Sequence, residues 1–77
     1  MSKLLRKARK QAGITITELA EKAGLSRATI DKIEKGKPIR YESAAKVIIA
    51  FNQLAGTAYT VEDLKIVISS NWGDSEN

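Results

Sequence analysis

The feature that most limits how this chain can fold is residues 15–36, TITELAEKAGLSRATIDKIEKG, in which two short helical patterns meet at a glycine. The first pattern has Thr15 as its N-cap, with Glu18 placed to reach back to the Thr15 amide, and it ends at Gly24. The second pattern has Ser26 as its N-cap. The sequence therefore predicts two short helices with defined ends and a tight turn between them.

Two hydrophobic pairs fix how the chain enters these helices. Ile14 with Leu19, and Leu25 with Ile30, have the spacing of a hydrophobic staple across a helix N-terminus. Two helices joined by a three- or four-residue turn with a glycine are the sequence form of a helix-turn-helix, whose second helix lies in the major groove of DNA. We therefore predict a helix-turn-helix over residues 16–35.

The sequence also predicts helices in the rest of the chain. Apolar residues recur at helical spacing in residues 2–12, 41–54 and 60–70, with Thr60 as the N-cap of the last segment. The run Ile66-Val67-Ile68 is β-branched and is also compatible with a strand. We expect an all-α, compact five-helix bundle, with one helix-turn-helix domain over residues 1–70 and a C-terminal tail over residues 71–77.

Composition excludes several kinds of site. A chain of 77 residues makes one small domain, and the absence of cysteine and histidine removes disulfides and the usual zinc ligands. The longest apolar run, residues 47–51, is far shorter than the roughly 20 residues of a membrane span. We expect a cytoplasmic protein without a cofactor, a metal or a membrane partner.

Charge is divided unevenly along the chain. Residues 1–40 contain eleven Lys or Arg and four Asp or Glu, for a net charge of +7, whereas residues 41–77 have a net charge of −3. The N-terminal half is therefore suited to meet a polyanion. In contrast, no paired carboxylates, activated nucleophile or glycine-rich phosphate loop indicates an enzyme.

The second helix of the motif turns polar or small side chains outward. Arg27 can donate two parallel hydrogen bonds to guanine O6 and N7, and Lys32 can donate less rigidly one turn later. Ala28 and the methyl group of Thr29 suit thymine methyl groups. For Asp31 we favour an ion pair along the helix, with Arg27 or Lys35, over hydrogen bonding to a cytosine amino group.

The segment TELAEKAGLSRATIDKIEKGK, residues 17–37, resembles the phage repressor and Cro (XRE) family of helix-turn-helix domains, and the similarity runs from about Leu5 to Leu64. The resemblance implies a bundle of about five helices that binds operator DNA as a homodimer. By position it places Arg27, Ala28 and Lys32 at base edges and pairs Arg9 with Glu34. The other contacts expected, to the DNA backbone or the groove wall, come from Thr17, Ser26, Thr29, Lys35, Lys37 and Arg40.

Two features depart from the family pattern. The first residue of the second helix, commonly a glutamine that hydrogen-bonds phosphate, is Ile16, which cannot do so. The segment NQLAGTAYT, residues 52–60, inserts several residues between the fourth and fifth helices. We expect the dimer surface to include Ile49 and Ile66 as exposed aliphatic residues, together with Val67 and Trp72, although the same residues could belong to an ordinary core.

These observations predict a sequence-specific regulator of transcription that binds double-stranded DNA, most simply a Cro-like repressor on a near-palindromic operator. Two alternatives remain at this point. One is a protein-interaction module, such as an antitoxin that holds a toxin or an anti-repressor. The other is an activator of the restriction-controller type, which would contact RNA polymerase.

Overall fold

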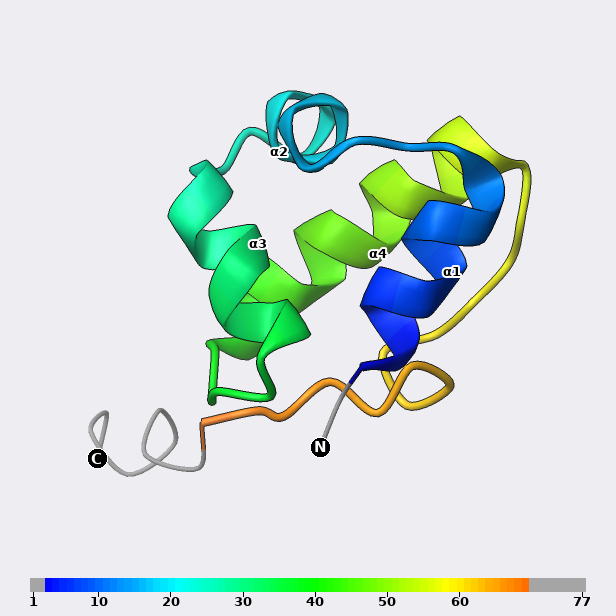
Figure 1. Cartoon of the computed structure of the whole chain (residues 1–77). Coiled ribbons are helices and arrows are strands. Elements are labelled where there is room, and N and C mark those ends of the chain that lie inside the picture. The colour runs from blue at the N-terminus through cyan, green and yellow to red at the C-terminus, as the bar shows by residue number, and fades with distance from the viewer. Residues whose placement is uncertain (1–2, 70–77) are drawn as a thin grey trace.

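The computed structural model describes residues 3–69, which form four helices and no extended sheet. The helices are α1 (Leu4–Ala12), α2 (Ile16–Ala23), α3 (Arg27–Glu34) and α4 (Tyr41–Ala55). Figure 1 shows α1 and α3 in front of α4, the longest helix, with α2 across the top of the bundle. The all-α class and the four helices predicted before residue 56 are confirmed.

The capping residues predicted from the sequence make the expected hydrogen bonds. Thr15 Oγ1 accepts from the amide of Glu18 at 3.0 Å, and Glu18 Oε1 accepts from the amide of Thr15 at 2.8 Å. Ser26 Oγ accepts from the amide of Thr29 at 3.2 Å. These side chains satisfy amides that the first turn of a helix leaves without a partner, which is why α2 and α3 begin where they do.

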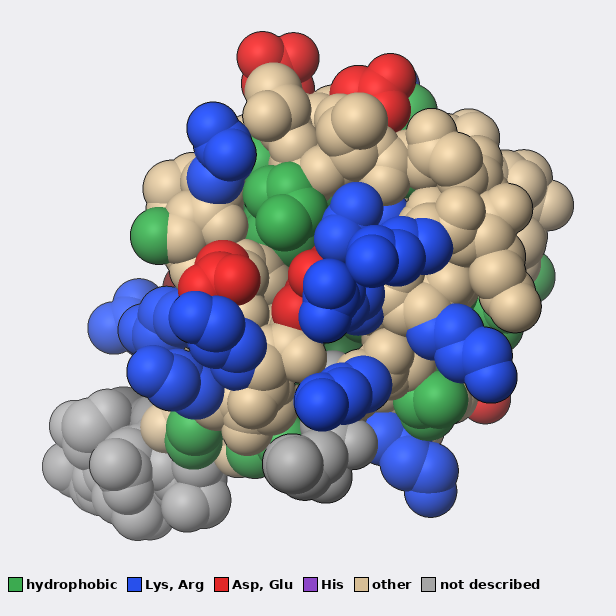
Figure 2. Space-filling view, in the orientation of Figure 1, with side chains coloured by type: hydrophobic (Ala, Val, Ile, Leu, Met, Phe, Trp, Pro, Cys, Tyr) green, Lys and Arg blue, Asp and Glu red, His purple; other side chains and the backbone are tan. Residues whose placement is uncertain are grey.

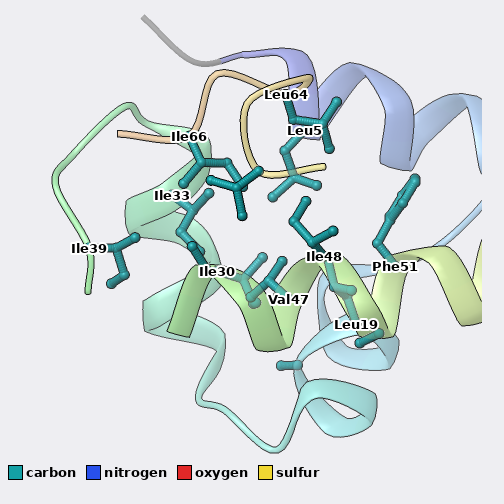
Figure 3. Close-up of a cluster of buried hydrophobic side chains, with 14 of the residues drawn as sticks. Leu5, Leu19, Ile30, Ile33, Ile39, Val47, Ile48, Phe51, Leu64 and Ile66 are labelled. Atoms are coloured by element: carbon teal, nitrogen blue, oxygen red, sulfur yellow. The ribbon is translucent and has the colours of Figure 1, made fainter. Parts of the chain in front are cut away.

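The core lies between α4 and the three shorter helices. Its fully buried large side chains come from every helix: Leu5, Leu19, Ile30, Ile33, Val47 and Phe51. Figure 3 shows that side chains from residues 64 and 66 converge on the same cluster. The broad apolar face predicted for residues 41–54 is therefore covered by the chain itself.

The predicted fifth helix is wrong. Thr60 does cap as expected, since its Oγ1 accepts from the amide of Asp63 at 3.0 Å, and Asp63 Oδ2 accepts in return from the amide of Thr60 at 2.9 Å. Only a single turn follows, over residues 61–65. Lys65 then adopts a left-handed conformation, with φ of 52°, and ends the turn. The chain continues extended, and Ile39 forms an isolated parallel bridge with Ile68. The β-branched run takes the extended alternative because its backbone pairs with the loop before α4.

The backbone contacts of this last segment explain a second correction. The amide of Ile39 donates to the carbonyl oxygen of Val67 at 3.0 Å, and the amide of Ser69 donates to that of Ile39 at 2.8 Å. This pairing turns Ile66 inward, where it is 7% exposed, and leaves Val67 half-buried. The expectation that Ile66 is an exposed aliphatic is therefore wrong. Trp72 lies outside the described residues.

The inserted segment after α4 is organised by one side chain. Asn52 Nδ2 donates to the carbonyl oxygen of Tyr59 at 2.9 Å, and Asn52 Oδ1 accepts from the amide of Tyr59 and the hydroxyl of Thr57. The ring of Tyr59 lies against that of Phe51, with centroids 5.9 Å apart. These contacts hold the insertion against the end of α4 and direct the chain back past α1 (Figure 1).

Candidate nucleic-acid interface

The turn between α2 and α3 has the geometry that presents α3 at the surface. Gly24 takes a left-handed conformation, with φ of 72°, and the amide of Leu25 donates to the carbonyl oxygen of Ala20 at 3.0 Å. A glycine suits this position because a Cβ would strain it. Ile30 and Ile33 anchor α3 in the core, and the opposite side of α3 faces solvent.

The outward side of α3 places the predicted base-reading residues together. Arg27, Ala28 and Lys32 are exposed, and no carboxylate among residues 3–69 lies within salt-bridge distance of Arg27 or Lys32. Thr29 is half-buried, and its hydroxyl lies 3.0 Å from that of Ser26. Two cationic donors and an exposed methyl group are thus free to meet a ligand.

The partner of Asp31 is Lys35. Lys35 Nζ lies 3.0 Å from Asp31 Oδ2, one helical turn away, and both side chains are about half exposed. Of the two partners considered from the sequence, the ion pair therefore uses Lys35 and leaves Arg27 free. This pair also keeps the only acidic side chain on the outward side of α3 at least partly neutralised.

The pair expected between Arg9 and Glu34 is present and buried. Arg9 Nε donates to Glu34 Oε2 at 2.6 Å, and Arg9 Nη2 donates to Glu34 Oε1 at 3.2 Å. The third guanidinium nitrogen, Nη1, donates to the carbonyl oxygen of Ile14 at 2.9 Å. One arginine therefore joins α1, the turn before α2 and the C-terminal end of α3, which fixes the orientation of α3 in the bundle.

The candidate backbone-contacting residues surround α3. Thr17 is exposed in the first turn of α2, and Lys37 and Arg40 are exposed in the loop between α3 and α4. Arg40 lies 3.7 Å from Glu42, an exposed contact that would yield readily to a phosphate. Figure 2 shows Lys and Arg side chains gathered over α1 and the C-terminal part of α3 on one face.

Two open hollows border this face. The larger, about 470 Å³, lies between α1 and α3, and its lining residues are Lys3, Arg6, Arg9, Ile16, Asp31, Glu34 and Lys35. The smaller, about 340 Å³, is lined by Ile16, Arg27, Ala28 and Asp31. Within the described residues, no three or more His, Cys, Asp or Glu side chains are grouped to hold a metal ion.

The hollows add three residues to the site. Lys3 and Arg6 share the larger hollow with Lys35, so these two of the outward basic residues of the first predicted helix, Lys3, Arg6, Lys7 and Lys10, face the same side as α3. From the sequence, a solvated face with long-range attraction of DNA is favoured over direct contact for these residues, because a helical pattern does not say which way α1 turns relative to α3. Ile16 borders both hollows. The sequence already marked Ile16 as unusual, because the family commonly has a glutamine at this position.

A sequence model of the helix-turn-helix family matches residues 5–54, which is more than half of the chain. The protein belongs to the XRE-type helix-turn-helix family. It is therefore a DNA-binding transcription regulator of the XRE type. Comparisons with curated proteins and with solved structures gave no significant match.

The family match ends earlier than the resemblance read from the sequence, which extended to Leu64. It stops at Leu54, one residue before the last residue of α4. The part beyond the match is the part in which the fifth helix is replaced by a turn and an extended segment. None of the helices within residues 3–69 of this XRE-type domain is long and apolar enough to cross a membrane.

Proposed function

We propose that this XRE-type protein is a sequence-specific, Cro-like repressor that binds a near-palindromic operator as a homodimer. The observation that carries the proposal is the outward side of α3. It presents Arg27, Ala28 and Lys32 to solvent, with no described part of the chain covering them. An α-helix of this kind fits the major groove of B-DNA, where each base pair shows a distinct set of donors, acceptors and methyl groups.

The roles of the individual residues follow from their chemistry. Arg27, in the first turn of α3, would bind guanine O6 and N7 with two parallel hydrogen bonds, and Lys32 would bind a base edge one turn later. Ala28 and the methyl group of Thr29 would contact apolar groups on the bases. The hydroxyl pair of Ser26 and Thr29 is placed at the start of α3, where it could also meet the groove wall.

Affinity would come from contacts to phosphates on either side of α3. Lys37 and Arg40 lie in the loop after α3, and Thr17 lies at the N-terminus of α2, where free amides and the helix dipole favour an anion. Lys35 lies at the hollow that it shares with Lys3 and Arg6. Such contacts position a protein on DNA without reading its sequence.

A dimer surface is proposed on the exposed side of α4. Ile49 is 58% exposed, and Tyr41, eight residues earlier on the same side of the helix, is 52% exposed. Because Ile66 lies in the core, Ile49 is the main residue left of the dimer surface predicted from the sequence. Val67, which is half-buried, lies next to the bridge between Ile39 and Ile68. Two copies joined in this way would read half-sites about one helical turn, roughly 10 bp, apart.

The regulatory effect proposed is repression by occupying a promoter, in the cytoplasm where the DNA is transcribed. The test is selection of bound fragments from random double-stranded DNA, followed by titration of the selected and a scrambled fragment. We expect one enriched motif with two inverted halves, binding at least about 10³-fold tighter than the scrambled fragment, and two protein chains per fragment. Equal binding to both fragments would contradict the proposal.

A further inference from the structure

The smaller hollow lies between the first residue of α2 and the N-terminal half of α3. Its lining residues are Ile16, Arg27, Ala28 and Asp31. Ile16 is half-buried and Ala28 is exposed, so both present carbon atoms to the same open space. The lining therefore combines two aliphatic side chains with one cationic donor and one carboxylate acceptor.

The side chain of Ile16 is well fixed for a residue at a helix N-terminus. Thr15 and Glu18 hold the preceding backbone through two hydrogen bonds, and part of the Ile16 side chain packs against the core. Isoleucine is branched at Cβ, which limits its rotation about χ1. The apolar wall is therefore formed before any ligand arrives.

The chemistry of the major groove restricts what could fill this space. Base edges there offer hydrogen-bond donors and acceptors and one apolar group, the methyl on C5 of a pyrimidine. Of the four lining residues, only Arg27 could donate to a phosphate, whereas Ile16 and Ala28 offer it no donor and the carboxylate of Asp31 would repel it. The hollow therefore suits a phosphate less well than an apolar group. A methyl group would instead lose its contact with water against two aliphatic side chains.

We propose that Ile16 and Ala28 form a subsite for the 5-methyl group of a pyrimidine, next to the guanine that Arg27 reads. Ile16 then determines specificity at that base pair, in addition to the outward residues of α3. This inference rests on the proposed function, since it requires α3 to lie in the major groove. It names part of the operator: one methylated pyrimidine at a defined position in each half-site.

The methyl group can come from thymine or from 5-methylcytosine, and Asp31 lies where the two differ. The group on C4 beside the methyl is an acceptor, O4, in thymine and a donor, the N4 amino group, in cytosine. The carboxylate of Asp31 favours the donor, but its ion pair with Lys35, at 3.0 Å, weakens that preference. The experiment therefore includes both bases.

The test uses the operator obtained by selection, in which single bases are changed. Replacing each thymine in turn by deoxyuridine removes only the methyl group, and replacing each cytosine by 5-methylcytosine adds only that group. For the unaltered protein we expect one position per half-site at which the methyl group strengthens binding about three- to tenfold. A loss of affinity with deoxyuridine would identify thymine as the source of the methyl group, and a gain of affinity with 5-methylcytosine would identify 5-methylcytosine.

The variant Ile16→Ala should bind the methylated and unmethylated operators within about twofold of each other, and Ile16→Val should show an intermediate ratio. Because the ratio compares two DNAs with one protein, a general loss of affinity or stability cancels. Leu54→Ala, which removes an exposed aliphatic side chain at the far end of α4, is the matched control and should keep the full ratio.

Two results would overturn the proposal: no position at which the methyl group matters, or an undiminished ratio in Ile16→Ala. In both cases the selected operator would still be bound, so the proposed function would stand. Failure to enrich any motif would instead remove the proposed function and this inference with it.

Discussion

At the scale of single residues, the outward side of α3 separates side chains that are free from side chains that are already engaged. Arg27 and Lys32 have no carboxylate partner among the described residues, whereas Lys35 is paired with Asp31. The sequence predicted correctly that Arg27 and Lys32 face outward, because exposure on a short amphipathic helix follows from its period. The sequence left the partner of Asp31 open, because Arg27 lies four residues before it and Lys35 four residues after it.

Replacing Arg27 tests direct base reading. Arg27→Ala should lose about 1 to 3 kcal/mol of binding to the selected operator, because two hydrogen bonds to guanine are removed, with little change on random DNA. Titrations of both DNAs measure this difference. Lys22→Ala, which removes an exposed charge from α2, is the control and should weaken neither strongly. An equal loss on operator and random DNA would assign Arg27 to phosphate.

Replacing Lys37 tests the backbone contact. The loop position of this exposed lysine predicts that Lys37→Ala weakens binding to every sequence and lowers the slope of log affinity against log salt by about one, since one phosphate contact is lost. Affinities measured at several salt concentrations give the slope. If the slope does not change, the side chain of Lys37 remains in solvent in the complex.

At the scale of elements, capped helices were predictable and the last segment was not. Thr15 and Ser26 mark the starts of α2 and α3 as N-caps, through local hydrogen bonds that depend on a few neighbouring residues. Thr60 makes the same kind of capping hydrogen bond, yet the helical turn that follows ends at Lys65. The outcome there is decided by pairing with Ile39, more than twenty residues away, which a local pattern does not contain.

The variant Lys65→Gly distinguishes the observed left-handed turn from a continuous helix over residues 60–70, because its effect on folding stability has the opposite sign in the two cases. In the left-handed turn observed, Lys65→Gly should be neutral or stabilise the fold by up to about 1 kcal/mol, because glycine avoids the cost of a positive φ. In a continuous helix over residues 60–70, the same change would cost about 1 kcal/mol. Urea denaturation of the variant and the parent measures the difference, and a clear loss of stability would favour the helix.

The joint between α1 and α3 depends on a buried ion pair. Arg9→Met should lower the free energy of unfolding by about 3 to 5 kcal/mol, because the Glu34 carboxylate stays buried without its partner. Lys35→Met breaks an exposed pair and should cost at most about 0.5 kcal/mol. Denaturation curves compare the two variants. Similar small losses would mean that Arg9 does not hold α3 in place.

At the scale of the whole molecule, basic residues that are spread along the N-terminal half of the chain gather on one face. Residues 3–40 contain α1, α2, α3 and the loop after α3, and Figure 2 shows Lys and Arg side chains of this part gathered on one face. Such a surface attracts DNA from a distance and makes association depend strongly on salt. The sequence predicted this attraction, whereas the hollows at Ile16 required the relative placement of three helices.

The proposed reading of an operator depends on α3 lying in the major groove. Its most direct test replaces each guanine of the selected operator in turn by 7-deazaguanine, which removes the N7 acceptor from that groove and leaves base pairing intact. We predict about a tenfold loss of affinity at one guanine per half-site, and no loss there for Arg27→Ala. Unchanged binding at every guanine would contradict the placement of α3.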